Sequence, residues 1–581
     1  MRKINNLIKM LVLCGGLFFA SCETTELDLT VNPNALSPTQ ADPDFYLNAI
    51  QISFAYLTEN NGRTAGQLAR VDYMSGRDYQ NAYSPAGFDG RWSSAYQTIM
   101  LDIVELNKIA DESGLTHHKG MGQVIQAHIL LTLVDFFGDI PYTEAFQGAA
   151  NLNPVADSGA SVYAVAISLL DSAIANFNDD ALAEPALDMY YGGDWAAWTK
   201  AANTIKMKAY MATRLVDGSA VSKFNAIVAS GNYISSNADD MQFQWGTNAV
   251  QPDSRHPRYR GSYTSTGGGR YMSNSLMFYM IGNNPESAYS NPDRYDPRSL
   301  YYFYRQVGAT PGIAGATPDE EVLECGLQNA PAHYAGYVFC GAPKGWWGRD
   351  HGNDNGIPPD GFLRALSGAY PGGGALDDLT YSSKKDGDGN GGNGITPIML
   401  ASWTKFMIGE VELAGGNPAA AKNAMMDGID LSIDKVTSFT DKSDRFKWIF
   451  GDGLRPGTDP ADPANYGPAL TFEANYINWF KMDVIAEWDS ADDQGKWNLL
   501  GMQYFVAQYG NGLDAYNFYR RTGYPTTLQP NIEPNPGGFI RSFFYPANHA
   551  NTNQNITQKD GVTDQVFWDT NPGSPGFPVA N

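Results

Sequence analysis

A long apolar segment that ends in a turn with glycine and proline sets the strongest constraint on how this chain folds. Residues 123–146 read QVIQAHILLTLVDFFGDIPYTEAF. Apolar side chains recur there at spacings of three and four residues, which predicts a helix with most of its surface buried against other helices. Gly138 suits the left-handed conformation that ends many helices, and Pro141 prevents the helix from resuming. By spacing alone, the segment predicts a core helix with a sharp C-terminal stop.

Helical spacing of apolar residues recurs on both sides of a central region that lacks it. Before this region, further helices are predicted over residues 45–54, 92–106, 161–176 and 194–215. After it, helices are predicted over residues 396–436, with a break at 415–418, and over residues 472–485 and 497–509. The central region, residues 246–397, is rich in Gly, Pro, Tyr, Asn and Asp. A loop region of this length inside a folded protein is usually functional.

The N-terminus has the pattern of a secretory signal. Basic residues precede an apolar run over residues 11–20, which is much shorter than the roughly 20 residues that a transmembrane helix needs. We therefore expect residues 1–21 to be a cleaved signal peptide. The small residues before Cys22 resemble a lipobox, in which Cys22 is acylated and begins the mature chain; an ordinary signal peptide is the alternative. No later segment is apolar enough to span a bilayer, so we expect membrane contact through the lipid anchor only.

The charge balance excludes some ligand classes. The chain contains 39 Lys and Arg residues against 62 Asp and Glu residues, a formal net charge of -23. A surface of this sign repels nucleic acid and anionic lipid headgroups, so we expect neither as a ligand.

Motifs for catalysis are missing from the sequence. It contains no H-E-x-x-H metal helix, no P-loop and no G-x-S-x-G elbow. A pair of glycosidase carboxylates is recognised by its separation in space, which the sequence does not give. We therefore expect a binding protein that is not an enzyme, with a glycoside hydrolase as the alternative.

Several strings, in their order along the chain, resemble the SusD/RagB family of nutrient-binding outer-membrane lipoproteins. Residues 137–142, FGDIPY, resemble the hallmark turn of that family. Residues 194–215, DWAAWTKAANTIKMKAYMATRL, resemble a second signature, and residues 520–525, RRTGYP, are the most specific match. The resemblance implies a mainly α fold, in which tetratricopeptide-like helix pairs form a scaffold and a long loop-rich insertion carries little regular structure.

The resemblance also implies a domain organisation and a role. Residues 22–581 would form a single domain, with a helical scaffold over 22–245, the insertion over 246–397 and a helical part over 398–581. The protein would be lipid-anchored at the cell surface in the outer membrane. There it would capture a ligand and deliver it to a SusC-like TonB-dependent transporter. Oligosaccharide is the leading ligand and peptide the second; a structural adhesion module is an alternative of a different class.

Two loop clusters combine aromatic rings with polar side chains, which suits the apolar faces and hydroxyls of sugars. The predicted ligand-binding residues are Arg77, Asp78, Tyr79 and Tyr83 in the first cluster, and Trp346, Trp347, Arg349, Asp350 and Asn353 in the second. Trp92 is a further candidate, although its helical register with Tyr96 favours core packing. Trp346 and Trp347 are equally compatible with burial, because adjacent tryptophans seldom both face solvent.

Two cysteines remain once Cys14 has left with the signal peptide and Cys22 carries lipid. Cys325 and Cys340 are spaced for a disulfide that closes a loop of about 15 residues, which adds roughly 3 kcal/mol in an oxidising compartment. Two unpaired buried thiols are the alternative.

One segment has part of a calcium-binding pattern. Asp386, Asp388 and Asn390 place oxygen ligands at alternate positions, as in the first half of an EF-hand loop. Pro397 stands where the bidentate Glu of that loop belongs. We therefore favour a solvated loop, with calcium as the alternative and no other cofactor.

Overall fold

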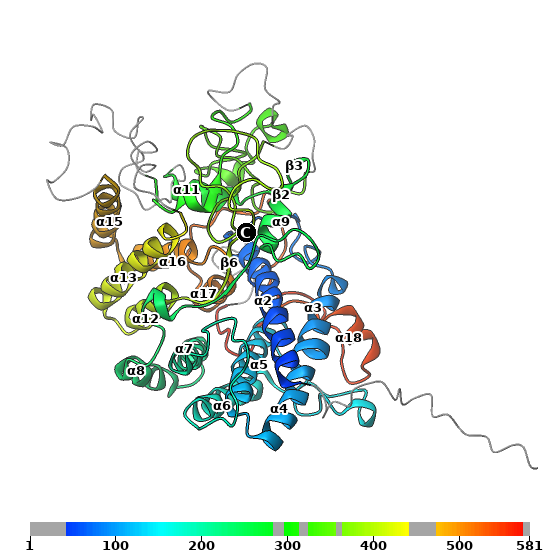
Figure 1. Cartoon of the computed structure of the whole chain (residues 1–581). Helices are drawn as coiled ribbons and strands as arrows, with labels where there is room; N and C mark the ends of the chain where they lie inside the picture. The colour runs from blue at the N-terminus through cyan, green and yellow to red at the C-terminus, as the bar shows by residue number, and fades with distance from the viewer. Residues whose placement is uncertain (1–41, 283–294, 313–322, 356–362, 441–471, 573–581) are drawn as a thin grey trace, which may run out of the picture. The chain divides into compact units, whose positions relative to one another are not determined.

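Helices make up most of the regular structure, and many of them pack against the next helix in the chain (Figure 1). The computed structural model describes residues 42–282, 295–312, 323–355, 363–440 and 472–572. The predicted signal peptide and Cys22 lie outside these ranges. The predicted mainly α fold with a loop-rich insertion is confirmed.

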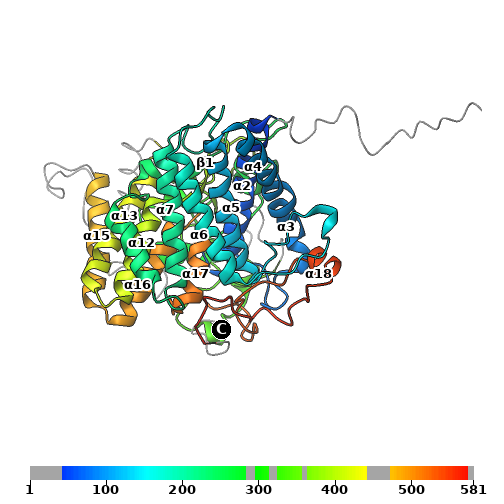
Figure 2. The ribbon, with the colours of Figure 1, turned by 90° about the horizontal axis from the view of Figure 1, so that it is seen from below.

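The N-terminal part of the scaffold is a row of helices. Its elements are α2 (Pro43–Leu68), η2 (Pro85–Phe88), α3 (Asp89–Ser93), the π-helix η3 (Ser94–Met100), α4 (Leu101–Ser113), α5 (Thr116–Phe137), η4 (Gly148–Ala150), α6 (Gly159–Phe177), α7 (Trp195–Thr213), α8 (Ala220–Ser230), η5 (Asn237–Asp239) and β1 (Met241–Gln244). Helix α5 packs on α4 and α6, and α6 packs on α7 (Figure 2).

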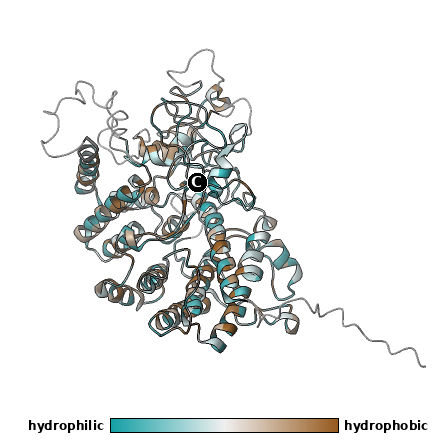
Figure 3. Cartoon of the chain, in the orientation of Figure 1, coloured by the Kyte–Doolittle hydropathy of each residue, from teal (hydrophilic) through white to brown (hydrophobic). Residues whose placement is uncertain are grey.

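The C-terminal part adds a second group of helices. Its elements are α12 (Ala401–Ala414), α13 (Pro418–Thr437), α15 (Phe472–Ser490), α16 (Asp493–Ala507), α17 (Leu513–Thr522) and α18 (Ala547–Thr552). Contacts of α12 with α7, and of α17 with α2, join this group to the first. Hydrophobic and hydrophilic residues alternate around many of these helices (Figure 3), as expected for helices with one face in the core.

Helix α5 ends where the sequence predicts. Gly138 adopts a φ of 79°, and its backbone N–H donates to the carbonyl of Val134 at 2.8 Å. A side chain is strained in this conformation, so glycine determines the stop. The helix is buried along almost its whole length, as the spacing predicts.

The expectation that no later segment is apolar enough to span a bilayer is wrong by length and composition alone. Among the residues that the structure describes, α5 and α6 are long and apolar enough to cross a membrane by length and composition. In α5 the apolar window is entirely buried within the protein, whereas in α6 a third of it is buried. Core helices of folded domains pass the same test, because burial in protein and burial in lipid both select apolar residues.

The insertion begins and ends at two paired strands. Strand β1 pairs antiparallel with β6 (Ile395–Met399), and Gln244 lies opposite Ile395. The helix predicted from residue 396 therefore starts only at Ala401. Pro397 explains the difference, because proline lacks the N–H that a helix interior requires, whereas it is tolerated at the edge of a sheet.

The insertion itself has only short elements among its described residues. They are α9 (Pro257–Ser262), β2 (Tyr263–Thr264), β3 (Gly267–Gly268), α10 (Asn274–Met280), α11 (Ser299–Tyr302), β4 (Phe303–Tyr304), η6 (Glu324–Leu327), η7 (Ala332–Tyr334) and β5 (Leu366–Ser367). Strand β2 pairs with β3, and β4 pairs with β5. Buried tyrosines and tryptophans, more than regular structure, hold these loops together.

The predicted disulfide between Cys325 and Cys340 is present. Both cysteines are buried and pack with Leu323 and Trp347 in a small separate hydrophobic cluster. The bond therefore closes a loop within the insertion, where hydrogen-bonded secondary structure is sparse.

A buried ion pair joins three helices of the scaffold. Glu410 of α12 is fully buried and accepts hydrogen bonds from Arg521 of α17 at 2.7 and 2.6 Å. Arg214, the C-cap residue of α7, donates to the same carboxylate at 3.1 and 3.0 Å. Although burial by itself raises the pKa of Glu410, the two guanidinium groups outweigh it, and the pKa lies below its ordinary value.

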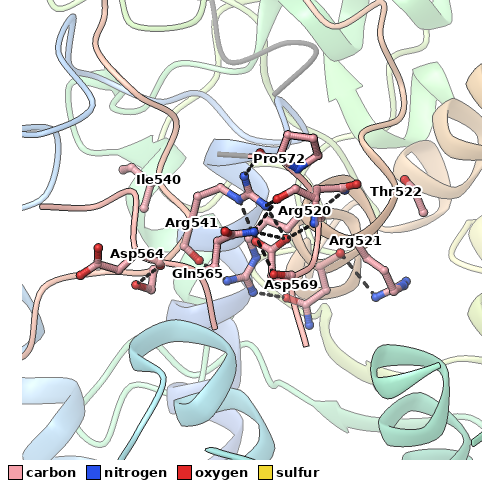
Figure 4. Close-up of polar contacts among 12 residues, drawn as sticks. Arg520, Arg521, Thr522, Ile540, Arg541, Asp564, Gln565, Asp569 and Pro572 are labelled. Atoms are coloured by element: carbon pink, nitrogen blue, oxygen red, sulfur yellow. Dashed lines mark hydrogen bonds and ion pairs between the residues drawn. The ribbon is translucent and has the colours of Figure 1, made fainter. Parts of the chain in front are cut away.

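The neighbouring residue Arg520 joins α17 to the end of α5. Figure 4 shows its side chain among polar contacts near Arg541 and Asp569. Its guanidinium donates to the backbone carbonyls of Asp135 at 2.8 Å and Arg541 at 2.5 Å. The Asp135 carboxylate accepts from Asn517 at 2.7 Å and from the indole of Trp568 at 3.0 Å. The two arginines of the RRTGYP string therefore tie α17 to different parts of the scaffold.

Removing the disulfide is expected to destabilise the protein. Replacing both Cys325 and Cys340 by alanine removes a cross-link across 15 residues, and we expect a loss of roughly 3 kcal/mol in the free energy of unfolding. Urea denaturation of the mature chain measures it. A double variant as stable as the parent protein would contradict this prediction.

Breaking the Glu410 ion pair is expected to destabilise the protein at least as much as removing the disulfide. Arg521→Ala leaves a buried carboxylate short of one cation, so we expect a loss of about 3–5 kcal/mol at pH 7. Lys223→Ala, which breaks an exposed pair with Asp217, is the control and should cost under about 1 kcal/mol. Similar losses of unfolding free energy in the two variants would show that the buried pair stabilises the protein no more than an exposed one.

The same ion pair predicts a pH dependence. Because the pKa of Glu410 is lowered in the folded protein, its contribution is complete above the ordinary value of 4.5 and is lost as the pH falls through the folded value. Unfolding measured from pH 7 to pH 3 should show this loss in the parent protein. Glu410→Gln should reduce the slope of stability against pH in that acidic range, and an unchanged slope would contradict the assignment.

Candidate functional site

A pocket of about 640 Å³ lies among α3, η3, the loop after α5, and α18. We call it the aromatic pocket. Aromatic rings, amides and two carboxylates line it, with a few aliphatic side chains at its edge. The residues used below are Asp89, Trp92, Tyr96, Gln97, Glu105, Pro141, Phe146, Asn151, Asn548, His549 and Asn553.

Four rings form a row along this pocket. The ring centroid of Trp92 lies 4.6 Å from that of Tyr96 and 4.5 Å from that of His549. Tyr96 lies 6.0 Å from Phe146, with an angle of 26° between the ring planes. All four side chains are half-buried, so part of each remains open to the pocket.

The π-helix η3 carries one of these rings and directly follows the short helix that carries another. Trp92 belongs to α3, and Tyr96 lies within η3. Single π-helical turns within helices occur frequently at functional sites, because the wider turn changes the direction of side chains. Here the helical segment exposes two neighbouring rings while Ala95 and Ile99 stay in the core.

The FGDIPY turn builds the second wall. The Tyr96 hydroxyl donates to the carbonyl of Pro141 at 2.7 Å. The backbone N–H of Tyr142 donates to the Asp157 carboxylate at 2.7 Å, and that of Gly159 donates to Asp139 at 2.8 Å. The turn that stops α5 is thus held rigidly, and it positions Phe146 opposite the π-helix.

Helix α18 closes the third side. The backbone N–H of Asn548 donates to Asp89 at 2.8 Å, and the Asn553 side chain donates to the carbonyl of Pro154 at 2.8 Å. Burial lowers the pKa of His549 to about 4, so its imidazole is neutral at pH 7. Its Nε2 atom has no hydrogen-bond partner among the described residues.

The chemistry of this pocket suits the recognition of a neutral polar ligand. Stacked rings offer apolar faces, while Gln97, Asn151 and the carboxylates of Asp89 and Glu105 offer hydrogen bonds around them. Within the described ranges of the chain, no three His, Cys, Asp or Glu residues lie together as a metal site would require. The arrangement has the side chains with which a protein could bind and orient a ligand without catalysis.

The two predicted ligand clusters lie side by side. The Tyr79 hydroxyl of the first loop is 3.0 Å from Nε2 of His351 in the insertion. Arg77 forms an ion pair with Asp354 at 2.6 Å and donates to Asn355 at 2.9 Å. Sequence spacing did not indicate that these loops, more than 250 residues apart, form one contact surface.

Most residues of these clusters are packed inside the protein. Tyr79, Trp346, Trp347, Arg349, Asp350 and Asn353 are buried, whereas Arg77, Asp78, Tyr83 and Trp92 retain exposed surface. The guanidinium of Arg305 lies 4.4 Å from the ring centroid of Trp346, and Trp347 packs on the disulfide. These two indoles therefore present no face to solvent, and their observed role is packing.

The sequence reasoning missed three of the four rings. Tyr96 was assigned only to a core helix, and Phe146 and His549 were not singled out. An i, i+4 pair of aromatics, Trp92 and Tyr96, was the available signal, because such pairs lie on one helix face. His549 gave no comparable signal, since it joins the pocket only through the fold.

The residues considered for calcium already have protein partners. Arg255 forms an ion pair with Asp386 at 2.5 Å. The Asp388 carboxylate accepts from the backbone N–H of Lys385 at 2.8 Å. A cation at this loop would have to displace Arg255.

Comparison with known proteins shows a similarity to SusD-like proteins in the N-terminal part of the chain. Residues 33–285 match the SusD-like family described as "Starch-binding associating with outer membrane". No curated protein matches the chain.

Solved structures share the fold over most of its length. A SusD homolog from Bacteroides uniformis has 17% sequence identity and a TM-score of 0.59, covering 91% of this chain and 99% of its own. A SusD/RagB family protein from Bacteroides thetaiotaomicron has 19% identity and a TM-score of 0.56, covering 92% and 100%. A chitin-binding SusD homolog from Flavobacterium johnsoniae has 17% identity and a TM-score of 0.58, covering 91% and 99%. The family match over residues 33–285 and the shared fold make this chain similar to SusD/RagB-like proteins.

Proposed function

We propose that this protein captures an oligosaccharide at the cell surface and does not alter it chemically. The observation that carries the proposal is the row of four half-exposed rings in the aromatic pocket, edged by amides and carboxylates. Ring faces bind the apolar C–H faces of sugars, and the polar edge accepts and donates hydrogen bonds to hydroxyls. A volume of about 640 Å³ lies within the range of typical ligand pockets, about 300–1,000 Å³.

Glycan is favoured over peptide by the comparisons and by the pocket. Two of the similar solved structures are named chitin-binding proteins. The aromatic pocket contains no lysine or arginine that could pair with a peptide carboxylate. Peptide remains the second candidate through the resemblance to the SusD/RagB family.

The proposed setting is the outer membrane. Acylation of Cys22 would anchor the mature chain, since each buried CH₂ contributes about 0.8 kcal/mol to membrane binding. The partner would be a SusC-like TonB-dependent transporter, which receives the captured ligand. Support comes from the signal-like N-terminus and from the description of the matching family as associating with the outer membrane.

A single ring should carry much of the affinity. We expect Trp92→Ala to weaken oligosaccharide binding by about tenfold, because it removes the central ring of the row. Isothermal titration of the mature chain with chitin, starch and xylan oligosaccharides measures this. Trp497→Ala is the matched control, since this half-buried indole stacks on Tyr524, outside the residues that line the pocket.

Three outcomes would contradict the proposal. Absence of binding to every glycan by a correctly folded protein would refute glycan capture, and tight binding to a peptide library would favour the second candidate. New reducing ends after incubation with polysaccharide would show a hydrolase. Equal effects of Trp92→Ala and Trp497→Ala would remove the aromatic pocket as the site.

A further inference from the structure

A second, smaller pocket of about 280 Å³ lies at the C-terminal end of α2. Residues of α2, of the following loop, of α9 and of the loop after β3 line it. We call it the arginine pocket, because three arginines from three segments meet there. They are Arg63, Arg258 and Arg270.

Two carboxylates, Glu59 and Asp72, pair with two of these three arginines. Arg63 pairs with Glu59 at 2.9 Å. Arg258 pairs with Asp72 at 2.5 Å, and its Nε lies 3.6 Å from Glu59. Glu59 is fully buried and Asp72 nearly so, so both are committed to these contacts.

The groups around the pocket do not neutralise the excess of three arginines over two carboxylates. His256 accepts from the backbone N–H of Arg258 at 3.0 Å through Nδ1, and its Nε2 lies 2.8 Å from the carbonyl of Ile395. Burial lowers its pKa to about 4, so it is neutral at pH 7. Arg91, near Arg63, adds a further cation, which donates a hydrogen bond to the Thr64 hydroxyl at 2.6 Å.

Arg270 has no carboxylate within ion-pair distance among the residues that the structure describes. Gly261 leaves room for its side chain, because a Cβ on Gly261 would lie 2.1 Å from Nε of Arg270. The backbone N–H of Gly269 donates to the carbonyl of Ser262 at 3.0 Å, which fixes the start of this loop. Arg270 is exposed as a residue, yet desolvation of its guanidinium, followed by the charges of Arg63 and Arg258, lowers its pKa to about 10.

Other groups in the pocket suit a sugar residue. The hydroxyl of Ser262 is fully buried, lines the pocket and has no hydrogen-bond partner within the described part of the chain. The rings of Tyr73 and Tyr271 also line it, with their centroids 5.8 Å apart and their planes at 74°. An unused buried hydroxyl, an unpaired guanidinium and two ring edges together point to a polar, anionic ligand group.

We propose that the arginine pocket binds the acidic group, carboxylate or sulfate, of one sugar residue in the captured glycan. This inference rests on the proposed function and specifies its ligand class. The small volume suits a single residue. The net charge of -23 on the chain repels polyanions at long range. The local excess of guanidinium groups in the pocket would attract an acidic sugar residue at short range.

The test compares matched acidic and neutral oligosaccharides. Titrations of the mature chain with oligogalacturonate, a sulfated galactan oligosaccharide and neutral galactan of equal length distinguish carboxylate, sulfate and neither. We expect at least one acidic probe to bind about tenfold more tightly than the neutral one, and this preference to shrink at high salt. Tight binding of the neutral probe alone would overturn the inference.

Variants test whether the preference for the acidic probe comes from the arginine pocket. Arg270→Ala should abolish the preference for the acidic probe, and Gly261→Ala should weaken it by displacing the same guanidinium. Lys223→Ala removes one positive charge from α8, outside the residues that line the pocket, and should leave the preference unchanged. An unchanged preference in Arg270→Ala would refute the site.

The two proposals fail in different ways. If no glycan binds, neutral or acidic, the proposed function itself is refuted. If neutral and acidic glycans bind equally and Trp92→Ala weakens both, glycan capture stands and the arginine pocket is excluded as an acidic subsite.

Discussion

The architecture depends on one buried carboxylate shared between two arginines. Glu410 lies between Arg521 and Arg214, and each residue comes from a different part of the chain. A buried charge that loses a partner is strongly destabilising, so these helices are constrained to keep their relative positions. Arg520 acts beside it by joining α17 to the C-terminal end of α5. The RRTGYP string therefore has a structural role, since both arginines lie in the core and hold together segments that are distant in sequence.

This constraint reaches the aromatic pocket through α5. The stop at Gly138 places the FGDIPY turn, and the turn places Pro141 and Phe146 against the π-helix. Sites built on rigid elements hold their side chains more precisely than sites on free loops. The pocket thus takes its geometry from the scaffold, although part of its lining comes from loop residues.

Local features of the sequence were predictable, and features made by tertiary contacts were not. The end of α5 followed from Gly138, and the mainly helical scaffold from apolar spacing, because both depend on neighbouring residues. The strand at Ile395 was missed, since its pairing with β1 crosses the whole insertion. Likewise, two adjacent tryptophans looked suitable for a ligand, but whether an indole is exposed depends on partners such as Arg305. For the same reason, the sequence indicated Trp92 but not His549.

The two pockets divide the chemistry of recognition. The aromatic pocket contains ring faces, amides and a neutral imidazole, and no arginine or lysine lines it. It is therefore suited to contacts with the shape and the hydroxyl groups of a neutral ligand. The arginine pocket holds more cations than its carboxylates balance, within a chain that is strongly acidic overall. Under the two proposals, long-range repulsion and short-range attraction would both act on an acidic glycan. An acidic sugar residue would then gain from the arginine pocket only when other contacts of the glycan, such as stacking on the rings, offset that repulsion.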